Sequence, residues 1–93
     1  MARPGPQIIA TLEAGERITD ICWADAVYAV YYQGRAIKVR SRGQDMINGF
    51  KYGRTSFPEP AHAIRLAQRL NRELNTDDFT VVELRIGRAV ALV

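Results

Sequence analysis

The stretch TSFPEPAHAIRLAQRLNRELNTDD (55–78) decides the fold, because it carries the start, the apolar stripe and the end of one helix. A proline at the first helical position costs no hydrogen bond, since that backbone nitrogen has no partner within the helix. Ser56 and Glu59 have the spacing of a capping box, although Glu59 can also be the N-cap itself, directly before Pro60. Turn-forming residues from Asn75 onward predict the end of the helix.

The helix is amphipathic. At about 100° per residue, the apolar residues at spacings of three and four fall on one stripe. The stripe consists of Ala63, Leu66, Ala67, Leu70 and Leu74. Arg65, Arg69 and Arg72 fall on nearly the opposite side. This pattern predicts a helix that packs on a sheet with one face and presents arginines with the other.

The residues before the helix predict a central hairpin. AVYAVYY (26–32) and RAIKVRS (35–41) are rich in β-branched and aromatic residues, and Gln33-Gly34 suits a two-residue turn. That register places the pairs Tyr32–Arg35, Val30–Ile37 and Tyr28–Val39 on one face, where the last two pairs suit a core. The opposite face carries Val27, Ala29 and Tyr31 across from Ala36, Lys38 and Arg40. A slip of one residue would exchange the two faces.

Two further hairpins complete the expected fold. QIIATLE (7–13) and RITDICWA (17–24) form the first, while FTVVEL (79–84) and RAVALV (88–93) form the last. We therefore expect an α+β fold with the order β-β-β-β-α-β-β. One antiparallel sheet of about five to six strands would carry the helix on one face. A flexible tail, residues 1–7, would precede a single domain, residues 8–93.

Length and composition favour a soluble globular protein. The chain has 93 residues, of which 47% are hydrophobic and 25% charged, so there is material for one domain and no sign of general disorder. No apolar run approaches the ~20 residues of a membrane span. The N-terminus lacks the apolar block of a secretory signal, and Cys22 is the only cysteine. We therefore expect a cytoplasmic protein that does not engage membranes.

Charge is unevenly distributed along the chain. Residues 7–25 contain one base, Arg17, and four acids: Glu13, Glu16, Asp20 and Asp25. Residues 35–54 contain six bases and one acid, Asp45. Clustered positive charge repels itself unless a partner neutralises it, so the pattern predicts an acidic partner such as nucleic acid or a nucleoprotein complex.

Basic and aromatic residues together define the candidate binding site. Arginine and lysine hold phosphates, and exposed rings stack on unpaired bases. The candidates are Tyr31, Lys38, Arg40, Arg42, Lys51, Tyr52 and Arg54, with a secondary basic ridge of Arg65, Arg69 and Arg72. A solvated strand and a solvated helix face would show the same residues, so that interpretation remains open.

The residues that could support catalysis are few. His62 is the only histidine and Cys22 the only thiol, and neither has local support for a catalytic pair. One histidine and one cysteine are also too few strong ligands for zinc. We expect a small buried thiol at Cys22 and a half-exposed His62 that serve packing. The expectation is a protein that is not an enzyme, with no catalytic residue, metal or cofactor.

The segment 55–84 carries a recurring pattern, TSF-x-x-P-x-HA, LA-x-x-LN and TD-x-F. In this it resembles small standalone proteins of proteobacterial phages and mobile elements. The resemblance covers about the last two-thirds of the chain and leaves residues 1–25 outside. It implies an accessory protein that binds a larger assembly, and it brings no catalytic residue.

Two functions follow as expectations. The first is a non-enzymatic binding module that engages nucleic acid or a nucleoprotein complex through its basic hairpin and loop. The alternative is a protein–protein inhibitor or accessory factor of phage or mobile-element origin, for example an inhibitor of a host defence complex, that uses its acidic N-terminal half. A homodimer that completes its sheet across exposed strand edges is also open.

Overall fold

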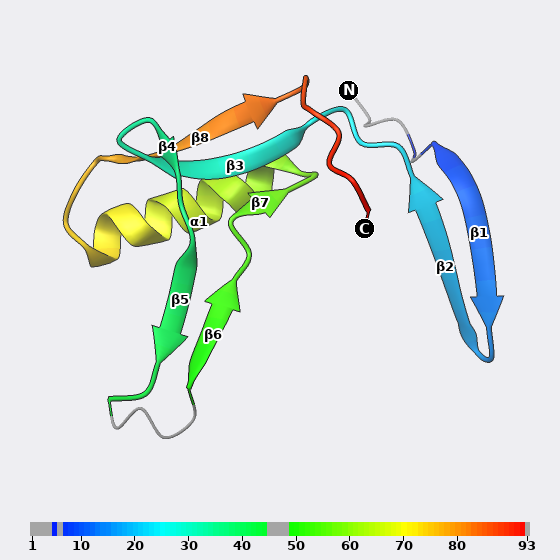
Figure 1. Ribbon diagram of the computed structural model, residues 1–93, viewed down its shortest axis with the longest axis horizontal. Coiled ribbons are helices and arrows are strands. Elements are labelled where there is room, and N and C mark those ends of the chain that lie inside the picture. The colour runs from blue at the N-terminus through cyan, green and yellow to red at the C-terminus, as the bar shows by residue number, and fades with distance from the viewer. Residues whose placement is uncertain (1–4, 6, 45–48, 93) are drawn as a thin grey trace.

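The computed structural model describes residues 5, 7–44 and 49–92 (Figure 1). The elements run β1 (Ile8–Ala14), β2 (Arg17–Cys22), β3 (Val27–Tyr32), β4 (Arg35–Ala36), β5 (Val39–Arg42), β6 (Phe50–Gly53), β7 (Ser56–Phe57), α1 (Pro60–Glu73) and β8 (Phe79–Leu84). The α+β class and the antiparallel pairing are confirmed. The expectation of one sheet is wrong, because the strands separate into three sheets. Most of the predicted tail, residues 1–4 and 6, lies outside the described residues.

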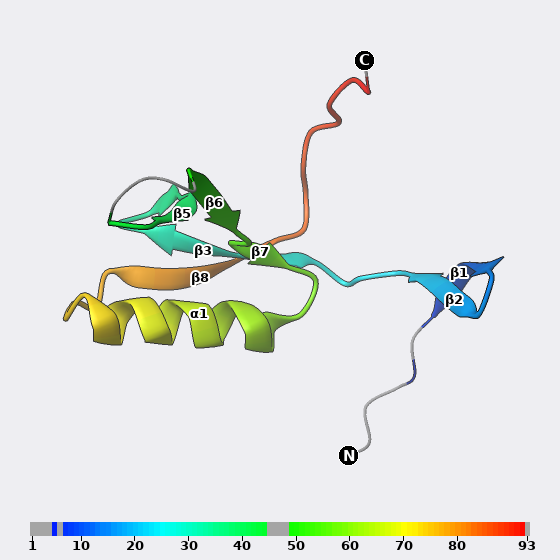
Figure 2. The same cartoon turned by 90° about the horizontal axis from the view of Figure 1, so that it is seen from below.

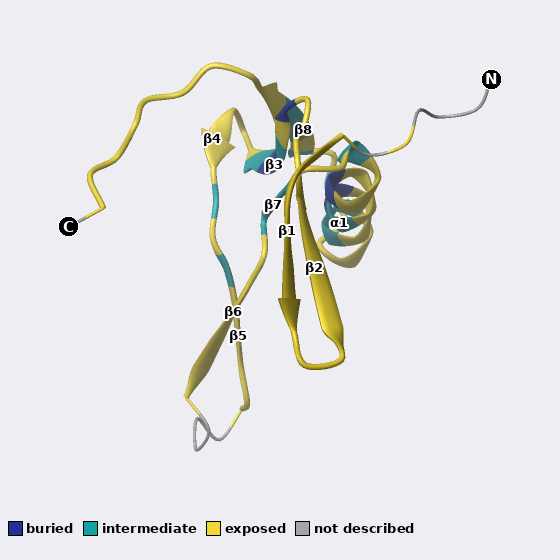
Figure 3. Ribbon diagram, turned by 90° about the vertical axis from the view of Figure 1, so that its right-hand side faces the viewer, coloured by how far each residue is buried: buried dark blue, intermediate teal, exposed yellow. Residues whose placement is uncertain are grey.

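The core lies between α1 and one face of the sheet that β3 organises. Val30, Ala63 and Ala67 are buried there, at 1%, 0% and 5% exposure, and Figure 3 shows buried residues on β3 and α1. Ala26, directly before β3, and Ala29 are also buried. Partly buried side chains surround them: Tyr28, Ile37, Phe57, Leu66, Leu70, Phe79 and Val81. The predicted stripe is confirmed except for Leu74, which is exposed because the helix has already ended there.

Both ends of α1 have a local cause. Glu59 is the N-cap, with extended backbone angles and no side-chain cap hydrogen bond, while Ser56 belongs to β7, so the capping box is not formed. At the other end Asn75 adopts the left-handed conformation, with φ of 52°. The amides of Asn75 and Thr76 donate to the carbonyl oxygens of Arg72 and Asn71. This is the pairing of a Schellman motif, which satisfies two carbonyls at the helix end.

The Asn71 side chain fastens the end of the helix to the start of β8. Its Nδ2 donates to the Phe79 carbonyl oxygen and its Oδ1 accepts from the Phe79 amide, each at 3.0 Å. The carboxamide thus imitates the pairing of a neighbouring strand. Both bonds are partly buried, so their loss would leave two backbone groups of Phe79 without these partners.

The central hairpin starts in the predicted register and then departs from it. Gln33 and Gly34 both have positive φ, 49° and 80°, as a type I′ turn requires. The pairs Tyr32–Arg35 and Tyr31–Ala36 form, but the predicted pairs Val30–Ile37 and Tyr28–Val39 do not.

A different segment occupies the β3 edge beyond Ala36. The Val30 amide donates to the Thr55 carbonyl oxygen at 2.8 Å, and β7 pairs with β3 through Tyr28–Phe57 and Ala29–Ser56. The chain after Ala36 is therefore free to leave β3, and β5 pairs with β6 instead. Residues 50–57, for which the sequence patterns above predict no strand, contain the two short strands β6 and β7.

The first hairpin, β1–β2, stands apart from the core (Figures 1 and 2). Gly15 supplies the positive φ of its turn, and the Thr11 hydroxyl donates to Asp20 Oδ1 at 2.7 Å across the strands. Every described side chain of the hairpin is exposed. The expected buried thiol at Cys22 is therefore wrong, because no core layer covers this hairpin in the described chain.

The prediction of a last strand at residues 88–93 is also wrong. Residues 85–92 form no strand, and Figure 2 shows them leaving the sheet on the side opposite α1. Ile86, Val90 and Leu92 are almost fully exposed. The remaining residue of the predicted strand, Val93, lies outside the described residues.

Replacement of Asn71 by alanine should lower the free energy of unfolding by about 1–3 kcal/mol, because two partly buried backbone groups lose their partners. Chemical denaturation measures the change. Gln68→Ala is the matched control, since Gln68 is an exposed residue of the same helix and should change stability by less than about 0.5 kcal/mol. Equal effects of the two substitutions would contradict the proposed role of Asn71.

Glu83 should make stability depend on acid pH. Its carboxylate accepts from Arg85 at 2.8 Å and from the Tyr28 hydroxyl at 3.2 Å, and these bonds lower the pKa of Glu83. A lowered folded-state pKa means that the stabilisation is complete above the ordinary value of 4.5 and is lost as pH falls through the folded value. Denaturation midpoints measured between neutral and acid pH should decline less steeply in Glu83→Gln, and an unchanged decline would contradict this.

Candidate functional site

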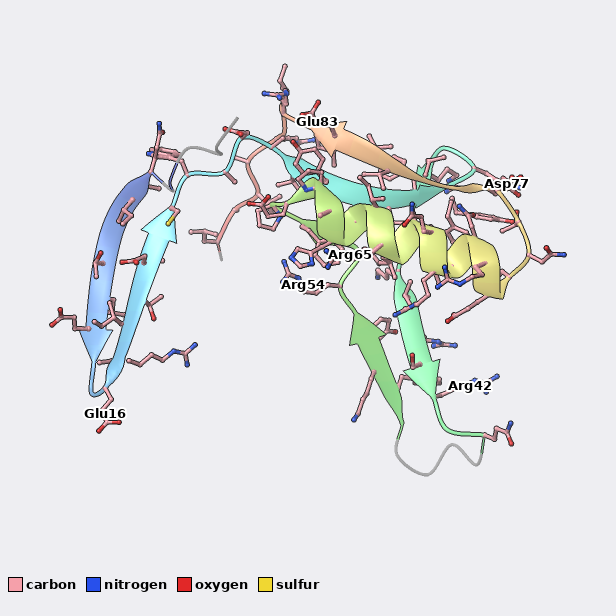
Figure 4. All side chains as sticks on the ribbon, turned by 180° about the vertical axis from the view of Figure 1, so that it is seen from behind. Glu16, Arg42, Arg54, Arg65, Asp77 and Glu83 are labelled. Carbon is pink, nitrogen blue, oxygen red and sulfur yellow. The ribbon has the colours of Figure 1, made fainter. Side chains whose placement is uncertain are left out.

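A groove lies where the segment between β6 and β7 passes the helix. It has a volume of about 650 Å³ and is lined by Gly53, Arg54, Phe57, His62, Arg65, Leu66, Arg69 and Arg72. Four of these residues are arginines. They come from two separate parts of the sequence, and Figure 4 shows Arg54 and Arg65 near one another at the helix.

The helix supplies three of the arginines by periodicity. Arg65, Arg69 and Arg72 follow one another at spacings of four and three, so they form one stripe along α1. Arg69 Nε lies 3.9 Å from Glu73 Oε1, in an exposed ion pair of the kind that contributes little stability. Within the described residues no ion pair involves Arg65 or Arg72. Two of the three arginines of the stripe are therefore not neutralised by an acid within the described residues.

Arg54 enters the groove from the opposite wall. Its Cζ lies 4.9 Å from the centre of the Phe57 ring, and its Nη2 donates to the Ser56 carbonyl oxygen at 3.5 Å. The His62 ring lies 5.8 Å from the Phe57 ring, centre to centre. Arg54, Phe57 and His62 thus form a continuous run of flat groups beside the helix start. Stacking leaves the edge of the guanidinium available for hydrogen bonds.

A second cationic surface lies on the β5–β6 hairpin. Arg40 is opposite Tyr52 and Arg42 is opposite Phe50, so strand geometry places all four on one face. Arg40 Cζ lies 4.0 Å from the centre of the Phe50 ring, which agrees with that placement. We call these four residues the hairpin face. It adjoins the groove along the chain, because Gly53 ends β6 and lines the groove.

The structure brings together some of the predicted site residues and separates others. Arg40, Arg42 and Tyr52 share the hairpin face, whereas Lys51 pairs with Ser41 on its reverse. Arg54 joins the helix ridge in the groove instead. Tyr31 lies in β3, paired with Ala36 and Thr80, and Lys38 lies between β4 and β5. The basic residues therefore form two adjoining surfaces rather than one.

Three ring-bearing residues of these surfaces were not among the predicted binding residues. Phe57 and His62 line the groove, and Phe50 supports Arg40. Aromatic and other residues alternate in Phe50–Gly53, a pattern that is typical of a strand. A strand here places Phe50 and Tyr52 on the same face. Nothing in the local sequence indicated that Phe57 would face the helix arginines.

Other potential sites have weaker chemistry. A hollow of about 370 Å³ at the end of α1 includes Arg72 but also Asp77, so its charge is mixed. In residues 5, 7–44 and 49–92 the structure gathers no set of three or more His, Cys, Asp or Glu side chains that could hold a metal ion. The described helix α1 lacks the length and apolar character needed to cross a membrane.

Comparison of the chain with protein-family models, curated proteins and solved structures finds no match.

Proposed function

We propose that the protein is a non-enzymatic module that binds single-stranded nucleic acid, with the groove holding the phosphate backbone. The observation that carries the proposal is the convergence of Arg54 with Arg65, Arg69 and Arg72 on one groove. Regularly spaced positive charges suit the phosphates of a polynucleotide better than a single small anion. Each neutralised phosphate releases counterions, which favours binding at low salt.

The hairpin face supports a single strand over a duplex. Unpaired bases can stack on aromatic side chains, whereas the bases of a duplex are already stacked on one another. Tyr52 is 65% exposed, so its ring is accessible to a base. The Arg40 guanidinium covers one face of Phe50 and holds positive charge beside that ring. A strand lying along the groove could continue over this face at Gly53.

The protein–protein inhibitor or accessory factor is the second candidate. The observation that favours it is the β1–β2 hairpin, which presents Glu13, Glu16 and Asp20 together with exposed apolar residues. Figure 4 shows Glu16 at the tip of this hairpin, away from Arg54 and Arg65. A partner that binds there would be insensitive to nuclease treatment and to loss of the groove arginines.

Affinity for a single strand should fall steeply with salt. Four phosphate contacts predict a slope of log K against log salt near −3, and Arg65→Ala should make it shallower by about 0.7. Fluorescence anisotropy with a labelled oligothymidylate of about 12 nucleotides measures both quantities. Arg17→Ala, an exposed arginine of β2, is the matched control and should keep the wild-type slope. Absence of binding at low salt, or a slope unchanged in Arg65→Ala, would refute the proposal.

Tyr52→Ala should weaken single-strand binding by about 5- to 150-fold, which corresponds to the ~1–3 kcal/mol of one stacked base. Tyr52→Phe keeps the ring and should bind like the wild type. The same anisotropy titration, repeated with a duplex of equal length, tests the strand preference. If Tyr52→Ala and Tyr52→Phe lose affinity equally, the ring is not a stacking platform.

A further inference from the structure

The chain exposes far more surface than a compact chain of its mass. Its accessible area is 8556 Å², whereas a compact protein of 10.4 kDa exposes about 5,400 Å². Its radius of gyration is 17.0 Å, against about 12 Å for a compact domain of this length. Two segments that project from the core contribute to this excess: β1–β2 and residues 85–92 (Figures 1 and 2).

The β1–β2 hairpin presents an apolar face and unpaired edges. Ala10 is opposite Ile21 and Leu12 is opposite Thr19, so Leu12 and Ile21 share one face. Both are more than half exposed. A two-stranded hairpin alone is marginally stable in water, whereas a third strand and a covered apolar face stabilise it. Its outer edges also offer backbone groups that a further strand can pair with.

Residues 85–92 have the pattern of a strand that lacks a neighbour. In an extended chain Ile86, Val90 and Leu92 would lie on one side together with Arg88, and Gly87, Ala89 and Ala91 would lie on the other. They are at least 83% exposed. Arg85 of this segment is already paired with Glu83, but Arg88 adds a further positive charge and the segment has no acid, whereas residues 8–22 carry Glu13, Glu16 and Asp20 against Arg17. The two segments are therefore complementary in charge as well as in apolar pattern.

We propose that two copies of the chain form a reciprocal dimer in which residues 85–92 of each copy add as a third strand to the β1–β2 hairpin of the other. The exchange is closed by two-fold symmetry, because each copy supplies one hairpin and one strand. A stable interface needs about 800 Å² from each partner, and the whole chain exposes roughly 3,000 Å² more than a compact protein of its mass.

The directions of the two segments favour exchange between copies. Both leave the same end of the β3–β8 pair, where Val27 is opposite Leu84. Figure 2 shows that they then diverge, with residues 85–92 running away from the sheet and the hairpin extending to the side. Neither segment lines the groove or belongs to the hairpin face, so the dimer leaves the proposed nucleic-acid surface open.

Sedimentation velocity without nucleic acid tests the dimer directly. The wild-type protein should have a sedimentation-derived mass of twice 10.4 kDa. Val90→Asp should raise the dimer dissociation constant at least about tenfold, because it places a charge at the apolar contact. Val90 is 83% exposed in the single chain, so the substitution spares the core. Ala89→Asp puts the same charge on the other side of the strand and is the matched control. A wild-type monomer at every concentration, or equal effects of the two substitutions, would overturn the proposal.

A mixing experiment separates exchange between copies from closure within one chain. Leu12→Asp damages the hairpin and Val90→Asp damages the added strand, so each variant alone should be monomeric. Mixed together, they should form a heterodimer through the one intact hairpin and the one intact strand. If the mixture stays monomeric while the wild type is a dimer, the strand does not cross between copies and the proposal fails. The result is independent of nucleic-acid binding.

Discussion

The structure depends on the close packing of Val30 against Ala63 and Ala67. Two alanines one helical turn apart allow α1 to approach the sheet closely, and Val30 of the central strand fills the space between them. The partly buried rings and aliphatic side chains around this contact extend the core along β3, β7 and β8. Because the helix is fixed there, its arginine stripe is fixed as well, and so is the position of the groove.

The edge of β3 explains how the groove arises. Thr55, Ser56 and Phe57 occupy the part of that edge that the second strand of an ordinary hairpin would have taken. Phe57 joins the core from this position, and the Arg54 side chain next to it turns toward the helix arginines. The strand displaced from the edge becomes β5, which pairs with β6 and forms the hairpin face. One exchange of neighbours at β3 thus accounts for both cationic surfaces.

Local patterns in the sequence predicted the helix, the two-residue turn at Gln33-Gly34 and the first hairpin, because each depends on residues close together in the chain. The apolar period predicted Ala63 and Ala67 as core residues, and Glu59 was one of two predicted caps. The departure of the chain after Ala36 could not be predicted, since it depends on competition between Ile37 and Thr55 for the same edge. For the same reason the site was predicted as one basic cluster, although Arg54 lies with the helix ridge and Lys51 on the reverse of the hairpin. The exposure of Cys22 and of residues 85–92 likewise depends on which segments pair with strands distant in the sequence.

A map of backbone amide chemical shifts during titration with a short single-stranded oligonucleotide locates the nucleic-acid surface residue by residue. We expect the largest changes on residues that line the groove and on the hairpin face, at Arg54, Arg65 and Tyr52. Amides of β1–β2, including those of Glu13 and Asp20, should change little. Changes concentrated on β1–β2, or spread evenly over the surface, would contradict the assignment of the groove as the binding site.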